Sequence, residues 1–183
     1  MYNKYSEGKI IYLREVRESD VNDEYYSWLN DPEINQFLET RFFPRSKNDI
    51  LSYVRKMDGN PDEIFFAICI KENDKHIGNI KLGPINWIHR KGDISLVIGN
   101  KDYWGRGIAA EAIGLVIDFA FKVLNLHKLC AGYYESNIGS AKAFAKCGFI
   151  EEGRYRQEYF LNGDFTDVIR TGLINSDYSL AGK

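Results

Sequence analysis

The spacing of hydrophobic residues along the chain changes from helical to strand-like and then partly back. From Val21 to Met57, apolar residues recur every three or four positions, as on one face of a helix. From Glu63 to Gly99, dense apolar runs separated by short polar turns predict buried strands. Helical spacing returns after Gly105, and further strands follow it. This order predicts an α+β fold: helices first, then an antiparallel meander, then a strand–helix–strand–helix segment and a closing hairpin.

The first third of the chain is predicted to hold one strand and three helices. The strand covers residues 10–16. Ser19 and Asp20 are candidate N-caps of the first helix, because their side-chain oxygens can accept hydrogen bonds from the free N–H groups of a first turn. Pro32 suits the first turn of a second helix, which is predicted to continue to Leu38.

The later strands are separated by recognisable turns. They are predicted over residues 63–71, 76–87, 93–99 and 128–135, with a short helix over 139–147 and a final pair of strands after it. Asn73-Asp74 marks one hairpin turn. Asn162-Gly163 marks the last one, and it is the stronger signal because a type I′ turn needs positive φ at both central residues.

Composition and charge narrow the class of protein. The chain has 183 residues, enough for one domain with its own core, and residues 1–183 are predicted to form a single domain. Hydrophobic residues make up 44% and aromatic residues 14%, which excludes a disordered chain. Lys and Arg total 24 against 26 Asp and Glu, so no phosphate-neutralising surface and no nucleic-acid partner are expected.

Cysteine and histidine usage argues against a metal centre. Cys69, Cys130 and Cys147 are far apart, and the three histidines form no cluster, so neither a disulfide framework nor a metal site is expected. The chain starts with polar residues and contains no run of about 20 apolar residues, so no signal peptide and no membrane contact are expected. These features predict a cytoplasmic protein with reduced thiols.

One segment, Asp102 to Glu111, has the pattern of an anion-binding loop. A strand ends, Gly105 and Gly107 follow with one residue between them, and a helix begins. Glycines let backbone N–H groups approach an anion closely, and a helix N-terminus adds partial positive charge. A tight turn without a ligand is the commoner meaning of such a loop. The phosphate-loop pattern is absent, and Ala110 stands where the dinucleotide fingerprint needs a third glycine.

A second segment, from Asn137 to Phe149, helps to interpret the glycine loop. Asn137, Ser140, Phe144 and Gly148-Phe149 follow the next strand, and each alone fits a helix cap, a helix face or a helix end. In this order the two segments resemble the GNAT superfamily of acetyl-CoA-dependent N-acetyltransferases. The resemblance extends to Leu13-Arg14, Trp28 to Glu33, Tyr103 to Ala112 and Asn162-Gly163-Asp164, and so covers nearly the whole chain.

This resemblance implies a fold and an activity. The fold would be a mixed central sheet of about seven strands, splayed in the middle and flanked by helices. The activity would be direct attack of an amine on acetyl-CoA, without metal and without a cysteine acyl carrier. The branch it resembles holds ribosomal-protein Nα-acetyltransferases, spermidine acetyltransferases and nucleotide-amino-sugar acetyltransferases.

The resemblance also implies which residues hold acetyl-CoA. Backbone groups of a splayed strand would pair with the pantetheine arm like an added strand, and N–H groups of the glycine loop would hold the pyrophosphate. The implied cofactor residues are Leu96, Val97, Ile98, Tyr103, Trp104, Gly105, Arg106, Gly107, Ile108, Ala109, Asn137, Ser140 and Phe144.

The catalytic groups are less clear, because the chain departs from the family pattern. Many members have a Tyr at the position of Phe144, where its hydroxyl protonates the departing thiolate, and Phe144 has no proton to give. Ser140, one helical turn earlier on the same face, is the first candidate acid, and a helix cap is its structural alternative. Tyr133 and Tyr134 come next.

A base must take a proton from the amine, whose pKa is near the value of about 10.4 for a lysine. Glu158, on the strand before the last hairpin, is the first candidate by resemblance. Asp93 and Glu135 are its rivals, and a solvated strand carboxylate is the plain alternative for each.

Two charged clusters point to different acceptors. Seven acidic side chains lie between Glu15 and Glu33, opposed there only by Arg17, and an acidic rim would favour a polyamine or a protein N-terminus. A basic cluster of His89-Arg90-Lys91 with Arg41, Arg45 and Lys47 would favour a phosphate-bearing amino sugar or the 3′-phosphate of CoA. Solvated surfaces explain both clusters equally well, so the acceptor stays open. A homodimer is compatible with the resemblance, and a silent acyl-CoA-binding module is the alternative function.

Overall fold

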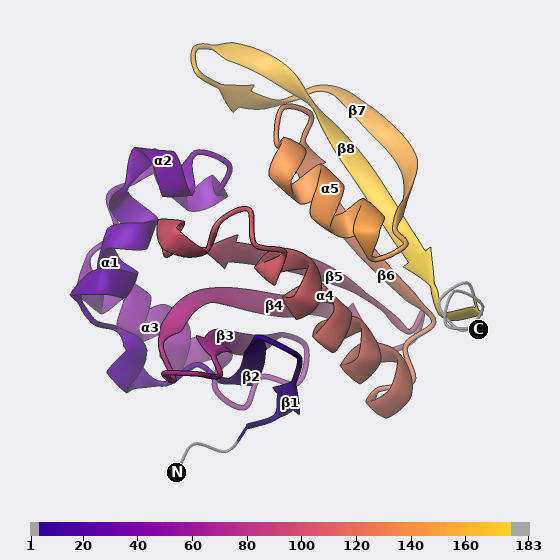
Figure 1. Ribbon diagram of the computed structural model, residues 1–183. Helices are drawn as coiled ribbons and strands as arrows, with labels where there is room; N and C mark the ends of the chain where they lie inside the picture. Colours follow the sequence, from indigo (N-terminus) through magenta and orange to yellow (C-terminus); the bar gives the residue numbers. More distant parts are fainter. Residues whose placement is uncertain (1–3, 177–183) are drawn as a thin grey trace.

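The computed structural model describes residues 4–176, and its centre is one mixed sheet of eight strands (Figure 1). The strands lie in the order β1-β2-β3-β4-β5-β6-β8-β7. They are β1 (Ser6–Glu7), β2 (Ile11–Glu15), β3 (Ile64–Ile70), β4 (His76–Asn86), β5 (Lys91–Ile98), β6 (Lys128–Tyr134), β7 (Ile150–Leu161) and β8 (Asp164–Ile174). The helices are α1 (Asp23–Asn30), α2 (Pro32–Asn35), α3 (Lys47–Met57), α4 (Ile108–Asp118) and α5 (Ile138–Lys146).

The sheet is splayed between β5 and β6, as predicted. These two strands run parallel and pair only from Lys91 with Lys128 to Asp93 with Cys130, whereas every other neighbouring pair of strands is antiparallel. Beyond Asp93 the two strands diverge (Figure 1). The sheet has one strand more than expected, because Ser6–Glu7 adds a short edge strand beside β2. β5 also starts at Lys91, two residues before the predicted start.

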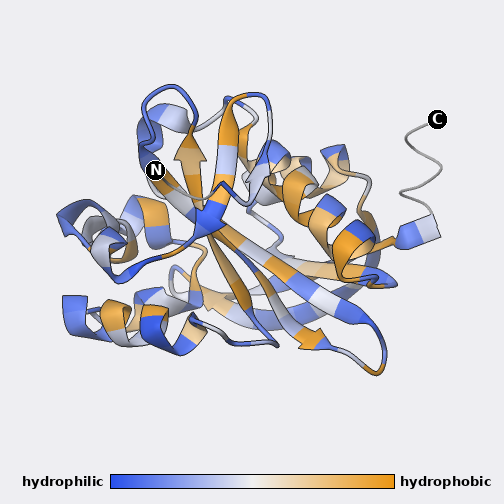
Figure 2. Ribbon diagram, turned by 90° about the horizontal axis from the view of Figure 1, so that it is seen from below, coloured by the Kyte–Doolittle hydropathy of each residue, from blue (hydrophilic) through white to orange (hydrophobic). Residues whose placement is uncertain are grey.

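Helices cover both faces of the sheet. Helix α4 and part of α5 pack on one face, in a core that includes Ile113, Ile117 and Phe144. Helices α1 and α3 share a second cluster built on Trp28 and Val54. The hydrophobic residues of the helices form stripes, which alternate with hydrophilic ones along each ribbon (Figure 2). Each fully buried aliphatic side chain contributes roughly 1.5–3 kcal/mol, so the two clusters hold the layers together.

The first helix begins later than predicted. Its N-cap is Asn22, whose side chain accepts from the N–H of Tyr25 at 2.9 Å, and neither Ser19 nor Asp20 caps it. Residues Glu18–Asp20 form a separate 3-10 turn. The second helix is also shorter, since α2 ends at Asn35 rather than at Leu38.

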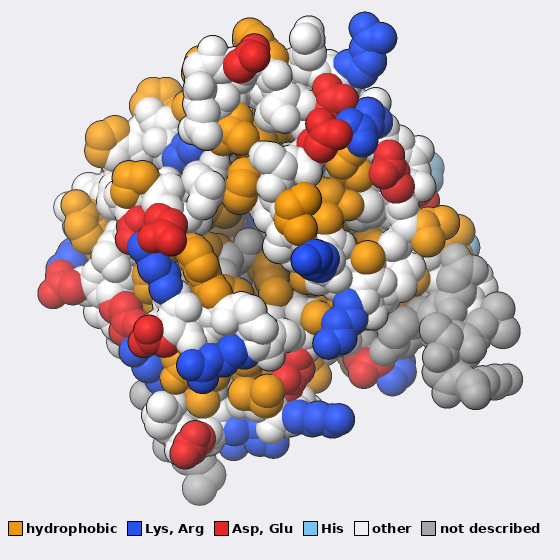
Figure 3. Space-filling model, turned by 45° about the horizontal axis from the view of Figure 1, so that its top comes forward, with side chains coloured by type: hydrophobic (Ala, Val, Ile, Leu, Met, Phe, Trp, Pro, Cys, Tyr) orange, Lys and Arg blue, Asp and Glu red, His pale blue; other side chains and the backbone are white. Residues whose placement is uncertain are grey.

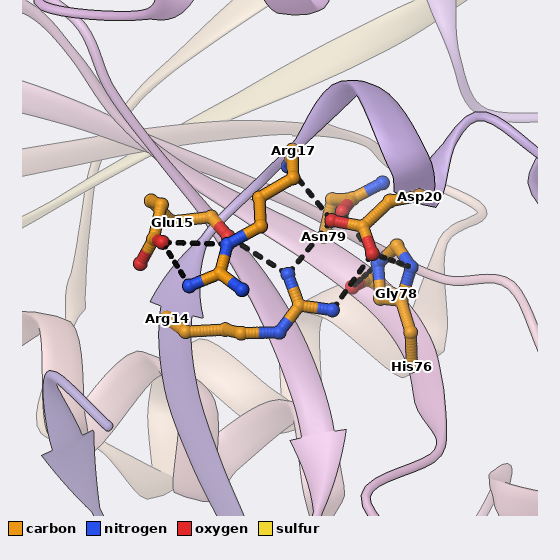
Figure 4. A network of polar contacts seen from close by, with 7 residues as sticks. All are labelled: Arg14, Glu15, Arg17, Asp20, His76, Gly78 and Asn79. Atoms are coloured by element: carbon orange, nitrogen blue, oxygen red, sulfur yellow. Dashed lines mark hydrogen bonds and ion pairs between the residues drawn. The ribbon is translucent and has the colours of Figure 1, made fainter. Parts of the chain in front are cut away.

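Asp20 has a different role, which the sequence did not reveal. Its carboxylate is buried and accepts two hydrogen bonds of 2.7 Å from the guanidinium of Arg14 on β2 (Figure 4). The N–H of Arg17 also donates to it at 2.7 Å. Burial opposes the charged form, but these donors outweigh it and lower the pKa of Asp20. Removing one partner of such a buried pair costs about 3–5 kcal/mol.

The same network includes a buried histidine. Nε2 of His76 lies 2.9 Å from the carbonyl oxygen of Gly78 and from Oδ1 of Asn79, and its Nδ1 lies 4.0 Å from Asp20 (Figure 4). The Trp28 ring packs edge-on against the His76 ring, with 5.0 Å between centroids. Burial lowers the pKa of His76, although Asp20 acts in the other direction. This network joins α1 to β2 and β4 beneath the N-terminal helices.

The predicted hairpin turns have the expected backbone. Asp74 has a φ of 55°, and Asn162 and Gly163 have φ of 52° and 92°. Positive φ at both residues of the last turn is what a type I′ hairpin requires. This turn projects the β7–β8 hairpin beyond the rest of the sheet (Figure 1).

Candidate active site

Where the sheet splays, the facing edges of β5 and β6 have no backbone partner. The pairing of β5 with β6 stops at Asp93 and Cys130, and β5 then continues to Ile98 paired with β4 only. An open strand edge can accept an extended chain as an added strand. Leu96, Val97 and Ile98, the predicted pantetheine contacts, lie on this open edge, and all three are half-buried.

The glycine loop after β5 has the backbone conformation of an anion site. Gly105 and Gly107 have φ of 71° and 79°, in the left-handed region that favours glycine. Gly107 is the N-cap of α4, so the free N–H groups of the first helical turn lie at this loop. Nothing lies within 4 Å of the position that a Cβ would take on Gly105. The loop therefore offers donors, partial positive charge and room for a phosphate.

Two charged side chains influence the loop. Nζ of Lys146, in the last turn of α5, lies 3.9 Å from the position that a Cβ would take on Gly107. Glu111 is the acid in the first turn of α4, but its carboxylate accepts from the N–H of Ile10 at 2.8 Å and so faces β2. The sequence did not predict Lys146, because its position depends on how α5 packs against α4.

The other predicted loop residues hold the loop together. The indole N–H of Trp104 donates to the carbonyl of Ile98 at 2.7 Å, which folds the loop back onto the end of β5. The guanidinium of Arg106 lies 5.4 Å from the centre of the Tyr103 ring. Ile108 is buried at the start of α4 and anchors the helix in the core.

Helix α5 brings the second predicted group of residues to the same side of the sheet. Oδ1 of Asn137 accepts from the N–H of Ser140 at 3.0 Å, so Asn137 caps the helix. The bond uses the backbone of Ser140 and leaves the cap independent of its hydroxyl. Phe144 is buried, and its ring stacks on Tyr133 and meets Phe149 edge-on. Phe144 is therefore a core residue next to the splay.

The candidate base Glu158 is separated from β6 by strand β8. It is exposed on β7, the edge strand, and the next residue, Tyr159, packs its ring 5.0 Å from that of Tyr134. Glu158 lies where β7 departs from regular pairing with β8, between Tyr155 and Tyr159, so its direction does not follow from the alternation of a regular strand.

Of the two rival carboxylates, Asp93 is the one at the splay. It is the last residue of β5 that pairs with β6, and it accepts from Nη2 of Arg170 at 3.1 Å. Glu135 follows the end of β6 and is bound to Arg154.

A polar cluster at the far end of β6 joins Tyr134, a candidate acid, to Arg41 of the expected basic cluster and to Glu39. Tyr134 is buried, donates its hydroxyl proton to Glu39, and accepts from Nη1 of Arg41 at 2.7 Å. The same guanidinium donates to the carbonyl of Phe160 at 2.5 Å. Burial and the bond to Glu39 raise the pKa of Tyr134 to about 12. This cluster connects the segment after α2 to the splayed strand.

The acidic rim expected between Glu15 and Glu33 is not an array of free carboxylates. Each of its members faces a cation, and for all but Glu15 that cation lies outside the stretch from Glu15 to Glu33. The pairs are Glu15–Arg17, Glu18–Arg55, Asp20–Arg14, Asp23–Lys47, Glu24–Lys75, Asp31–Lys101 and Glu33–Lys101. Lys101 belongs to the loop after β5, so two of these acids tie α2 to the start of the glycine loop.

The expected basic cluster is divided in the same way. Lys47 pairs with Asp23, and Arg41 is bound to Tyr134 and to the carbonyl oxygen of Phe160.

An open groove of about 480 Å³ lies between helices α1 and α2 and the tip of the β7–β8 hairpin. It is lined by Leu29, Asn30, Pro32, Asn35, Gln36, Arg41, Phe43, Pro44 and Asn162. Figure 3 shows a hollow in the upper side of the molecule, with hydrophobic side chains along its border.

A splayed mixed sheet, an open strand edge and a glycine loop at the start of a helix define an acyl-CoA-dependent transferase. The family model described as an acetyltransferase (GNAT) domain matches residues 11–150, and the chain belongs to this family. It is an acetyl-CoA-dependent N-acetyltransferase, and the predicted fold, cosubstrate and reaction class are confirmed.

Relatives with a known activity include spermidine acetyltransferases. The chain is 34% identical over 162 residues to spermidine N(1)-acetyltransferase of Escherichia coli K12, covering 74% of this chain and 86% of that one. It is 35% identical over 102 residues to the Vibrio cholerae enzyme, covering 56% and 58%. An uncharacterized N-acetyltransferase of Bacillus licheniformis, p20, is 28% identical over 98% of this chain and 99% of its own.

Solved structures agree with this placement. The crystal structure of Vibrio cholerae spermidine N-acetyltransferase in complex with CoA and spermine superposes with a TM-score of 0.85, at 26% identity, over 94% of this chain and 99% of that one. A dodecameric structure of the same enzyme gives a TM-score of 0.80.

Within residues 4–176, no helix is long and apolar enough to cross a membrane. No group of three or more His, Cys, Asp or Glu side chains there could hold a metal ion.

Proposed function

We propose that this enzyme transfers the acetyl group of acetyl-CoA to a primary amine by direct attack at the fork where β5 and β6 separate. The observation that supports this most is the alignment of three features in chain order: the open edge of β5, the glycine loop and the N-terminus of α4. The pantetheine arm of CoA would lie along β5, and the pyrophosphate of CoA would lie at the backbone N–H groups of residues Tyr103 to Ala109.

The reaction needs two proton transfers at this fork. The substrate ammonium loses one proton before attack, and its nitrogen then bonds to the thioester carbon. A second proton leaves the nitrogen as the C–S bond breaks; the group that protonates the thiolate gives its own proton to the sulfur and takes this one in exchange. The products are an amide, CoA thiol and one free proton. We assign the amine's proton to Asp93, because this carboxylate lies at the fork, and keep Glu158 as its rival.

Ser140 is the proposed donor to the thiolate. It lies in the first turn of α5, half-buried, one helical turn before Phe144. Because Asn137 caps the helix through the backbone of Ser140, the serine hydroxyl is left available for chemistry. An N–H group of the open β5 edge would stabilise the negative charge on the carbonyl oxygen during attack.

Polyamines are the acceptor class that we place first. Their support is the group of spermidine acetyltransferases among the relatives. The N-terminal acids give this assignment less support than the sequence suggested, because each of them already faces a cation. Peptide N-termini and amino sugars are therefore the comparison acceptors in its test.

The test is thiol release from acetyl-CoA over a panel of spermidine, spermine, glucosamine, a nucleotide amino sugar and peptides with free N-termini. Mass spectrometry identifies the acetylated product. We expect the highest kcat/KM with a polyamine. Turnover only with a peptide or a sugar would overturn the acceptor assignment. Thiol release with none of these amines, from protein that binds acetyl-CoA, would contradict acetyl transfer to these amine classes.

A further inference from the structure

The fork between β5 and β6 is crossed by a side chain from a third strand. Arg170 lies on β8, where its register partner on β6 is Gly132. Nη2 of Arg170 donates to Oδ1 of Asp93 at 3.1 Å. Asp93 lies on β5, so the arginine reaches over β6 to the strand beyond it.

Gly132 makes this crossing possible. A Cβ on Gly132 would lie 2.6 Å from Nη1 of Arg170 and 3.3 Å from its Cδ. Real Cβ atoms do not approach other atoms as closely as 2.6 Å, so any side chain at this position would displace the guanidinium. The absence of a side chain at Gly132 therefore leaves room for the Arg170 side chain to pack against the β6 backbone.

The crossing falls where the backbone ladder ends. The last β5–β6 pair is Asp93 with Cys130, and Gly132 is the second residue beyond it on β6. Past this point no backbone pair connects the two arms, and the bond from Arg170 to Asp93 connects them through side chains instead. Both side chains are partly exposed, 34% for Arg170 and 40% for Asp93, so the pair lies at an opening.

The pair also lies on the side of the sheet opposite α4. Ile94 belongs to the core under α4, and successive residues of a strand point to opposite faces. Asp93 and its register partner Cys130 therefore face the side that carries α1 and α3. An amine that approaches the fork from this side can reach the Asp93 carboxylate, which is 40% exposed.

We propose that Arg170 is a positioning residue for acetyl transfer. Its side chain crosses Gly132, connects β8 to β5 at the fork and holds the Asp93 carboxylate where the substrate ammonium loses its proton. We call this Arg170–Asp93 connection the brace. This inference rests on the proposed role of Asp93 as the base. A cross-strand ion pair that only stabilises the sheet is the competing explanation. The two differ in what they predict for kcat, because a base that moves by about 1 Å loses about 10²-fold in rate.

A double-mutant cycle separates these explanations. Asp93→Asn, Arg170→Gln and the double variant are compared by kcat and by KM for both substrates. Arg170→Gln should lower kcat by about 10²-fold and leave KM for acetyl-CoA nearly unchanged. In the Asp93→Asn background, Arg170→Gln should cause almost no further loss. Losses that multiply in the double variant would overturn the brace.

Three further variants complete the design. Arg170→Lys should recover part of kcat, because an ammonium can still reach across a glycine. Gly132→Ala keeps the charge but displaces it, so it should also lower kcat, and a normal kcat in this variant would contradict the brace. Arg154→Gln breaks a comparable arginine–carboxylate pair on the edge strand and should leave kcat unchanged.

The design distinguishes failure of the brace from failure of the proposed base. An Asp93→Asn variant with full activity would show that Asp93 is not the base. Loss of activity in Asp93→Asn, together with multiplying effects of Arg170→Gln, would reject only the brace. The acetyl-CoA-induced shift in melting temperature shows in each variant that the fold and the cofactor site are intact.

Discussion

The two faces of the sheet differ in the groups that they present. One face carries α4 and α5, and the other carries α1 to α3. The first presents backbone: an open strand edge, two left-handed glycines and a helix N-terminus. The second presents side chains brought together from distant segments, such as Arg170 with Asp93 and Arg41 with Tyr134. A backbone site tolerates many side chains, whereas a side-chain site changes with each substitution. Under the proposed function, the first side would keep the same cofactor through sequence changes that alter the acceptor on the second.

The largest effect is expected from a substitution in the backbone site, at the glycine loop. Gly107→Val forces a β-branched residue into a φ of 79° at the N-cap of α4. Acetyl-CoA should then no longer raise the melting temperature, and activity should be lost. The readout is thermal unfolding with and without millimolar acetyl-CoA.

Gly59→Val is the matched control for Gly107→Val. Gly59 also has positive φ, 67°, with nothing within 4 Å of a Cβ position, and it follows α3 away from the loop. This variant should unfold at a lower temperature yet keep the shift with acetyl-CoA. An unaltered shift in Gly107→Val would refute the loop as the phosphate site.

The next largest effect concerns Ser140. Ser140→Ala should lower kcat by about 10²-fold if its hydroxyl protonates the thiolate, with little change in KM for acetyl-CoA. Stability should be nearly unchanged, because Asn137 accepts from the backbone N–H of this residue and the alanine retains it. Asn137→Ala is the contrasting variant and should cost about 1 kcal/mol of unfolding free energy. Wild-type kcat in Ser140→Ala would leave solvent to protonate the thiolate.

The Lys146 side chain adds a positive charge beside the glycine loop. Lys146→Gln removes the ammonium beside Gly107, and KM for acetyl-CoA should rise about tenfold or less, with kcat unchanged. With acetyl-dephospho-CoA, which lacks the 3′-phosphate, Lys146→Gln should raise KM by the same factor if the lysine faces the pyrophosphate. Lys56→Gln in the last turn of α3 is the control and should change neither constant. A drop in melting temperature without a change in KM would assign Lys146 to the end of α5 only.

The smallest effect is expected at Cys130, the cysteine at the fork. Burial raises the pKa of its thiol, so little thiolate is present at neutral pH to carry an acetyl group. Cys130→Ala should keep turnover within a few-fold of wild type. An acetylated Cys130 trapped by mass spectrometry, with activity lost in the alanine variant, would replace direct attack by a two-step transfer.

The sequence predicts the backbone side better than the side-chain side, for a physical reason. Gly105, Gly107 and Asn137 act through local conformation, which short motifs encode. The seven acids near the N-terminus looked unopposed, because their cations come from positions as distant as Lys101. Asp20 resembled a helix cap, and only the fold shows it buried against Arg14.

Distance along the chain also explains what was missed at the fork. Arg170 follows Asp93 by 77 positions, and no spacing rule connects them. Gly132 carries no signal either, since a glycine inside a strand has many explanations. Glu158 was favoured by family resemblance, and it lies in the irregular part of β7 between Tyr155 and Tyr159, which the sequence did not predict. Side-chain sites of this kind require the three-dimensional structure.

The buried histidine under α1 couples the stability of the N-terminal helices to proton uptake. The folded protein keeps His76 neutral, because burial lowers its pKa below the ordinary value of 6.5. Below that pH the unfolded chain binds a proton that the folded protein refuses, so the free energy of unfolding decreases as the medium is acidified from about 6.5. Asp20 adds a second loss of the same sign below its ordinary value of 3.8. The helices α1 and α3, which lie over this network, should therefore lose stability first as the pH falls, and His76→Gln should flatten the pH dependence of the urea-unfolding free energy between pH 7.5 and pH 5.5.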